Sequence, residues 1–81
     1  MISNDEIKAR FIALPEVKEI RVSGDGYHYQ LTVVADIFEG MTKLKRQQWV
    51  YAQLKVEITQ GQLHALTMET WTPGEWENKN G

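Results

Sequence analysis

The sequence contains no cysteine. This absence excludes disulfides, thiol catalysis and any metal site built from cysteines alone. The sequence also lacks a long apolar run, since none approaches the roughly 20 residues that a membrane-spanning helix needs. The first residues have neither the basic start nor the apolar stretch of a secretory signal. We therefore expect a cytoplasmic protein in a reducing compartment.

An excess of positive charge is missing as well. The formal net charge is −2 at pH 7, whereas an obligate nucleic-acid-binding domain usually carries a clear positive excess. The charge is nevertheless uneven along the chain. Residues 41–56 hold four basic side chains and no acidic one, namely Lys43, Lys45, Arg46 and Lys55. This basic segment leaves nucleic acid open as a partner.

The composition that remains is that of one small globular domain. The chain has 81 residues, of which 42% are apolar and 25% charged, and a disordered tail has fewer apolar residues than this. A chain of this length forms one domain and buries only about 60–65% of its unfolded surface. We predict a single domain over residues 1–81, with flexible ends at residues 1–2 and 78–81.

The first half of the chain predicts a helix followed by a β-hairpin. Ser3 and Glu6 form a capping-box pattern that starts a helix, and Pro15 ends it. Alternation of polar and apolar residues predicts strands over residues 19–22 and 27–35. The two glycines of residues 23–26 suit the tight turn between these strands.

The second half predicts a longer helix, a third strand and a last short helical turn. The helix is expected over residues 42–59, with an apolar face made of Leu44, Tyr51, Leu54 and Ile58 and with Val50 beside it. Residues 63–71 alternate as a strand, and residues 72–76 suit a helical turn capped by Thr72. The predicted order is αββαβ(α). The expected fold class is α+β, with one three-stranded sheet and the helices packed on one of its faces.

Five short blocks of this sequence resemble the BolA family, in particular its short bacterial IbaG-type branch. They occur in the family's order and spacing, and together they cover roughly residues 17 to 76. The blocks are Val22–Gly26, Phe38–Gly40, Lys45–Gln48, Leu63–Leu66 and Thr72–Trp76. The resemblance implies a type II KH-like fold, which agrees with the order of elements predicted from the residues.

The resemblance also implies a partner and a pair of ligands. BolA-like proteins form heterodimers with monothiol glutaredoxins of the CGFS type, bridged by a [2Fe–2S] cluster. The family's histidine that opens the third strand corresponds to His64. A second ligand comes from the loop between the first two strands, where other branches have cysteine or histidine, and here His28 is the residue of suitable chemistry. The alternative for His28 is a strand residue that only faces solvent.

The chemistry of the donors is consistent with this partnership. A [2Fe–2S] cluster needs four ligands, and two histidines can replace two cysteines on one iron. The chain has two imidazoles and no thiol, so it cannot complete such a site alone. The glutaredoxin cysteine and its bound glutathione would supply the rest. We expect the protein to have no cofactor when alone and to be a monomer or weak homodimer.

A nucleic-acid-binding regulator is the alternative function. KH domains hold nucleic acid through a GXXG loop, and some BolA relatives are described as transcriptional regulators in acid or envelope stress. Lys43, Lys45 and Arg46 are the candidate phosphate contacts. Residues 40–43 lie where a GXXG loop would fall, but they lack its second glycine. The alternative for each basic residue is an ordinary solvated helix face.

An enzyme is not expected. Ser23, Asp25 and His28 match a catalytic triad by residue type, but they lie within six residues on one hairpin, whereas a triad normally draws its members from separate elements. Trp76 is expected to pack the terminal turn onto the sheet. Trp49 falls off the predicted apolar face of its helix. Core packing is the default expectation for it, and a partly exposed contact surface is the alternative.

Overall fold

The computed structural model describes residues 1–80. The elements follow one another as α1 (Asn4–Ile12), β1 (Val17–Gly24), β2 (His28–Ala35), the 3-10 turn η1 (Asp36–Phe38), α2 (Lys43–Gln53), α3 (Lys55–Thr59), β3 (Ala65–Trp71) and α4 (Pro73–Asn80). This order confirms the predicted α+β class with a three-stranded sheet. No helix of residues 1–80 has the length and apolar character needed to cross a membrane.

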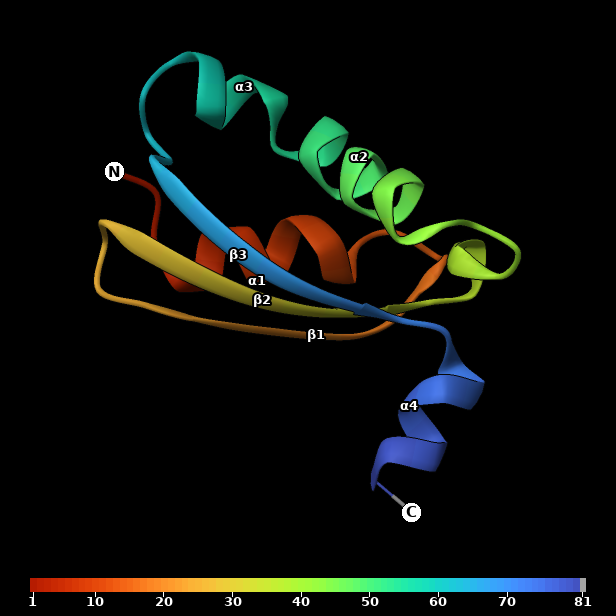
Figure 1. Cartoon of the computed structure of the whole chain (residues 1–81). Coiled ribbons are helices and arrows are strands. Elements are labelled where there is room, and N and C mark those ends of the chain that lie inside the picture. The colour runs from red at the N-terminus through yellow and green to blue at the C-terminus, as the bar shows by residue number, and fades with distance from the viewer. Residues whose placement is uncertain (81) are drawn as a thin grey trace.

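The sheet has the strand order β1-β2-β3, so β2 is central (Figure 1). β1 pairs with β2 in antiparallel fashion, as expected for a hairpin, and β3 pairs with β2 in parallel. The parallel pairing requires the chain to cross over between β2 and β3, and η1, α2 and α3 form this crossover.

The hydrophobic core lies between the sheet and the helices α1, α2 and α3, which cover one face of it (Figure 1). Along β2 the inward positions are Tyr29, Leu31, Val33 and Ala35, all of them buried. Two more aromatic side chains close the core beside Trp49. The Trp49 ring lies 6.4 Å from that of Phe11 and 5.6 Å from that of Phe38. Trp49 packs against the core, as the default expectation had it, but its side chain is only partly buried, so a contact surface at its exposed part stays a prediction.

Helix α1 begins as the sequence predicts. The Ser3 hydroxyl accepts the Glu6 amide at 3.1 Å, and the Glu6 carboxylate accepts the Ser3 amide at 3.2 Å. Ile7 and Phe11 are fully buried on the inner side of the helix. The helix ends at Ile12, three residues before Pro15.

The single helix predicted over residues 42–59 is interrupted. Leu54 has φ −113° and ψ 14°, which separates α2 from α3. The break leaves the Gln53 carbonyl free to accept Arg10 Nη1 at 3.0 Å. Arg10 also binds the Glu57 carboxylate, with Nη1 2.8 Å from Oε1. Glu57 is 5% exposed, and its hydrogen bonds with the Arg10 guanidinium hold its pKa below the usual range although burial acts to raise it.

The apolar face predicted for this helix is only partly correct. Val50 and Leu54 are fully buried, whereas Leu44, Tyr51 and Ile58 are exposed to solvent. The stretch contains more apolar residues than one buried face can hold. The stripe that includes Trp49 packs against the core, and the stripe that includes Leu44, Tyr51 and Ile58 faces solvent.

Helix α4 lies beyond the end of the sheet, away from the other helices (Figure 1). It is capped as predicted, since the Glu75 amide donates to the Thr72 hydroxyl and the Thr72 amide donates to the Glu75 carboxylate. Trp76 is half-buried and packs 6.2 Å from the Trp71 ring, with the Arg21 guanidinium 4.9 Å from its centre. The packing expected of Trp76 is confirmed, but the turn expected over residues 72–76 extends to Asn80.

Both ends of the described chain make ordered contacts in this structure, and the flexibility expected of the chain ends stays a prediction. Ile2 is 5% exposed, and its amide donates to the Gln62 carbonyl at 3.2 Å. The Tyr29 hydroxyl donates to the Ile2 carbonyl. Ile2 is therefore held through both its amide and its carbonyl group. Residues 78–80 continue α4, and residue 81 lies outside the described residues.

Candidate functional site

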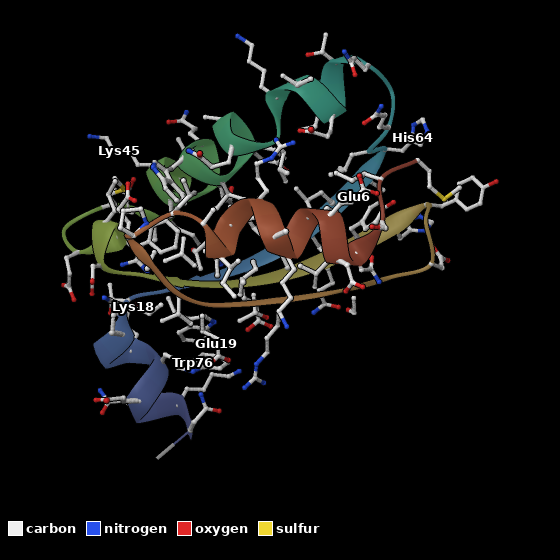
Figure 2. The ribbon with its side chains drawn as sticks, turned by 180° about the vertical axis from the view of Figure 1, so that it is seen from behind. Glu6, Lys18, Glu19, Lys45, His64 and Trp76 are labelled. Carbon is white, nitrogen blue, oxygen red and sulfur yellow. The ribbon has the colours of Figure 1, made fainter. Side chains whose placement is uncertain are left out.

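His64 lies at one end of the sheet, directly before β3. Leu63 is buried at 3% exposure and anchors the chain there, while His64 itself is exposed. Figure 2 shows its side chain at the start of β3, pointing away from the body of the protein. The Ala65 amide donates to the Tyr27 carbonyl at 3.3 Å and joins the segment to the loop before β2. The imidazole is thus open to a partner from outside.

His28 is the first residue of β2 and is also exposed. The turn before it is built by Asp25, whose Oδ1 accepts the amides of Tyr27 and His28 at 2.9 Å each. These backbone hydrogen bonds, that of His28 first, hold the pKa of Asp25 below its usual range. Asp25 is therefore occupied in the turn through backbone amides, which is not the use that a catalytic triad makes of its carboxylate.

Gly24 allows this turn to close tightly. A Cβ at this position would stand 2.3 Å from the backbone oxygen of His28. Real Cβ atoms essentially never come so close, and a backbone oxygen cannot rotate away as a side chain does. Gly24, which belongs to the Val22–Gly26 block, is thus required because the backbone of His28 comes too close to leave room for a side chain.

The strand register brings the two histidines to the same end of the sheet. His28 pairs with Ala65, so His64 is the residue directly before the partner of His28. Neither imidazole is hydrogen-bonded to another group within residues 1–80. No three His, Cys, Asp or Glu side chains of the described chain come together as a metal site. The end of the sheet therefore offers two nitrogen donors and no complete ligand set. We call the end formed by His28, His64 and the turn of residues 24–27 the histidine rim.

The N-terminal segment supports the histidine rim, and no pattern in the sequence indicated this role. Ile2 bonds to Gln62 as described, and the Asn4 side-chain amide donates to the Gly24 carbonyl at 3.3 Å. The Met1 sulfur lies over Gly26, in the space that a Cβ there would occupy. The N-terminal segment thus contacts both segments that carry a histidine, the turn before His28 and the chain before His64.

The three basic residues considered for nucleic acid differ in their surroundings. Lys43 and Lys45 are exposed at the start of α2, and Lys45 points outward in Figure 2. Arg46 has a side chain only 13% exposed. Its guanidinium binds the Glu75 carboxylate at 2.8 and 3.3 Å and the Thr70 carbonyl at 3.3 Å, and its Nε binds the Met41 carbonyl at 3.1 Å.

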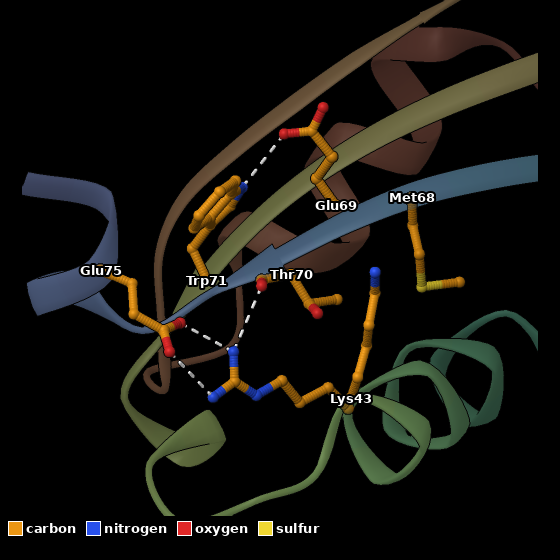
Figure 3. Close-up of a pocket in the computed structure, with 7 residues that line it drawn as sticks. Lys43, Met68, Glu69, Thr70, Trp71 and Glu75 are labelled. Carbon is orange, nitrogen blue, oxygen red and sulfur yellow. Dashed lines mark hydrogen bonds and ion pairs between the residues drawn. The ribbon is translucent and has the colours of Figure 1, made fainter. Parts of the chain in front are cut away.

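The Arg46 network fixes α4 to α2 and β3 (Figure 3). It lies at the opposite end of the sheet from the histidine rim, because Thr70 pairs with Val33 and Ala65 with His28. The Arg46 guanidinium and the Thr72 amide together lower the pKa of Glu75 to about 2. A hollow of about 390 Å³ adjoins the network, and Lys43 reaches from α2 toward β3 along it (Figure 3). The Arg46 side chain is therefore occupied by contacts that hold the fold together, whereas Lys43 and Lys45 form no ion pair with another residue of the described chain.

The chain is similar to known proteins along most of its length. Residues 11–75 match the family model described as BolA-like protein. The acid stress protein IbaG of Escherichia coli strain K12 is 37% identical over 75 residues, which cover 93% of this chain and 89% of that protein.

Solved structures show the same arrangement. A BolA protein homologue from Coxiella burnetii is 37% identical with a TM-score of 0.82, and the match covers 95% of this chain and 99% of that one. The BolA domain of SufE1 from Arabidopsis thaliana is 26% identical with a TM-score of 0.79, covering 93% and 99% of the two chains.

Proposed function

Because this chain belongs to the BolA family, we propose that it is a non-enzymatic adaptor in iron–sulfur cluster assembly or trafficking, which forms a [2Fe–2S]-bridged heterodimer with a monothiol glutaredoxin. The observation that carries the proposal is the histidine rim. Two exposed imidazoles lie at one end of the sheet, without a hydrogen-bond partner among residues 1–80, and the sequence has no thiol to complete a cluster site.

The donor set fits half of a cluster site. His64 and His28 would hold one iron of the [2Fe–2S] group through nitrogen, and the glutaredoxin cysteine with its bound glutathione would hold the other through sulfur. A cluster bound in this way is shared, and its chemistry lies in transfer or electron exchange. A reducing cytoplasm, which keeps glutathione available, is the compartment that suits this partnership.

In the proposed heterodimer, the role of this protein is to present two nitrogen donors from backbone segments that the fold holds in place. The Asp25 turn fixes the backbone of His28, and the buried Leu63 fixes the backbone of His64. Hydrogen bonds of Ile2 with Tyr29 and Gln62 join the two segments. Fixed donors lose less conformational entropy when they bind than mobile ones. A BolA domain occurs within SufE1. This is consistent with a domain that acts together with another protein domain, either fused to it or bound to it.

Reconstitution tests this function directly. The protein is mixed with a CGFS glutaredoxin, glutathione, iron and sulfide without oxygen, and the product is separated by size. We expect a coloured heterodimer whose visible absorption differs from that of the glutaredoxin homodimer. Coloured fractions that contain glutaredoxin alone would contradict the proposal.

A second candidate is a nucleic-acid-binding regulator of the acid or envelope stress response. It is favoured by Lys43 and Lys45, two exposed cations at the start of α2, the first of them beside the hollow along β3. The similarity to an acid stress protein suits such a role. If phosphates are bound, affinity for duplex DNA should fall with salt at a logarithmic slope near −0.9 per contact. Binding that persists when both lysines are changed to Ala would exclude these contacts.

A further inference from the structure

The outer side of α2 and α3 carries an apolar stripe that nothing in residues 1–80 covers. Leu44 is 62% exposed, Tyr51 42% and Ile58 38%. Leu44, Gln48 and Tyr51 follow one another at helical spacing, so their side chains form one ridge along α2. Lys55 and Ile58 of α3 lie beside Tyr51 around one depression. We call this surface, with Leu44, Tyr51, Lys55 and Ile58 as its members, the outer helix face. An apolar ridge left in water commonly marks a binding surface.

The outer helix face is hollowed where the helix breaks. The break is at Leu54, between the end of α2 and the start of α3. A depression of about 360 Å³ lies there, lined by Gln48, Tyr51, Ala52, Lys55, Ile58 and Thr59. A depression of this kind accepts a protruding side chain of a protein, whereas a lipid surface is met best by a continuous apolar helix face. The shape thus favours a protein partner over a membrane.

The charge around the outer helix face has one sign. Lys45 and Lys55 are both exposed and flank or interrupt the apolar ridge, and no acidic residue occurs between 41 and 56. The nearest acid along the chain, Glu57, is buried and bound to Arg10. In a symmetric contact between two copies the same patch meets itself, so the lysines of each copy would meet a patch whose residues 41–56 hold no acidic side chain. A second copy of this chain is therefore disfavoured.

We propose that the outer helix face binds an acidic amphipathic helix of a partner protein, with an apolar side chain of that helix in the depression and its carboxylates on Lys45 and Lys55. This mode of recognition places apolar residues of one helix at positions i, i+4 and i+7 into the surface of another. The opposite charges favour encounter and select against basic partners. The outer helix face contains neither histidine, so this contact is separate from the cluster partnership.

The test uses the whole protein and three synthetic peptides of about 15 residues, a length at which a helix becomes marginally stable in water. The first has Leu at i, i+4 and i+7 and Glu at most other positions. The second has Lys in place of Glu, and the third scrambles the first. Binding is followed by chemical-shift changes of backbone amides in a titration. We expect the acidic helical peptide to shift amides of α2 and α3, and the other two to leave them unchanged.

Matched variants locate the contact. Tyr51→Ser with Ile58→Ser should weaken binding by about tenfold or more, as expected when apolar side chains at the centre of a contact are lost. Lys45→Glu with Lys55→Glu should reverse the preference toward the basic peptide. Ile12→Ser is the control, because Ile12 is 65% exposed on α1, outside this surface, and binding should not change. His64→Ala should also leave binding unchanged, which separates this proposal from the cluster function.

Three outcomes would overturn the proposal. Equal binding of the acidic and scrambled peptides would show that charge alone is recognised. Binding to vesicles of phosphatidylcholine and phosphatidylglycerol that is lost in the Tyr51→Ser, Ile58→Ser variant, without binding of any peptide, would assign the face to membranes. Sedimentation that shows a dimer of the wild type and a monomer of the same variant would assign it to self-association.

Discussion

At the scale of single residues, the histidine rim depends on a glycine as much as on its two imidazoles. Gly24 has φ +154°, and the space for its missing side chain is occupied by the carbonyl oxygen of His28. Any larger residue must move either the turn or the first residue of β2. Because the neighbour is backbone in a paired strand, this movement disturbs the sheet.

We therefore expect Gly24→Ala to destabilise the protein, by about 1–3 kcal/mol, the range for a residue forced into a disfavoured backbone conformation. Urea unfolding followed by tryptophan fluorescence measures the change. Gly74→Ala is the matched control, since Gly74 lies in α4 and a Cβ added there would meet no atom within 4 Å. It should be neutral or stabilising, by up to about 1 kcal/mol. Equal losses in both variants would contradict the steric argument.

His64→Ala should abolish or strongly destabilise the cluster-bridged heterodimer and leave the fold unchanged. The side chain is exposed and makes no internal hydrogen bond within residues 1–80, so its removal costs little in the free protein, within about 0.5 kcal/mol. Visible absorption and cluster lifetime of the reconstituted complex are the measurements. Gln62→Ala, an exposed neighbour, is the control. A His64→Ala complex with unchanged absorption and lifetime would remove this residue from the site.

The sequence could indicate both histidines because so few donors were available. With two histidines and no cysteine, residue type restricted the candidates, and the family's blocks gave their positions. The support from Ile2 and Asn4 was not predictable in the same way. Their contacts are with Tyr29, Gln62 and Gly24, which are distant in sequence, and a short polar start has no periodic pattern that would indicate them.

At the scale of elements, α1, β1, β2, β3 and the cap of α4 followed from local signals. Capping residues, alternation and turn glycines act over a few positions, and each of these elements contains one. The stretch from Lys43 to Thr59 is different. Two apolar stripes were available there, and only the contacts with Phe11 and Phe38 on other elements select the stripe that includes Trp49.

Helix α4 is held by a charge-dependent contact, and its acid sensitivity follows from the pKa of Glu75. That pKa is lowered from 4.5 to about 2 in the folded protein. A carboxyl with a lowered pKa stabilises the fold above its unfolded pKa, and this contribution is lost as the pH falls through the folded pKa. The contribution of Glu75 is thus complete above about pH 4.5 and disappears toward pH 2.

We expect the Glu75→Gln variant to be less stable than the wild type at pH 7, and the difference to shrink as the pH falls from 4.5 to 2. Fluorescence of Trp71 and Trp76, which pack against each other at the base of α4, reports the docking of the helix. Glu77→Gln, also exposed on α4 but without an ion pair to another residue in 1–80, serves as the control. A constant difference between Glu75→Gln and wild type over this pH range would contradict the assignment.

At the scale of the whole molecule, the proposed heterodimer joins two kinds of ligand that respond differently to protons. An imidazole binds iron only through an unprotonated nitrogen, so protons compete with the metal. An ordinary imidazole titrates near pH 6.5, and bound metal shifts this competition to more acidic pH. We expect the heterodimer to lose its cluster in acid with up to two protons if both histidines are ligands, and with one if only His64 is.

The measurement is visible absorption through a pH titration of the heterodimer and of the glutaredoxin homodimer, whose thiolates are acid-sensitive as well. The difference between the two profiles reports the histidines. His28→Ala and His28→Cys are compared in the same way. Identical profiles for heterodimer and homodimer would exclude histidine ligands, and a His28→Ala profile equal to wild type would exclude His28 alone.

The parallel pairing of β2 with β3 also determines when the histidine rim comes into existence. The β1–β2 hairpin closes over three residues, 25–27, whereas β3 can join only after the whole crossover of residues 36–64 is in place. Contacts that close short loops form early in folding, and those that close long loops form late. During synthesis, which proceeds from the N-terminus, His28 is thus displayed on a finished hairpin while His64 still lacks its neighbours. The two imidazoles come to one end of the sheet only when β3 has paired with β2, so under the proposed function a nascent chain would lack the joined pair of nitrogen donors that a shared cluster needs.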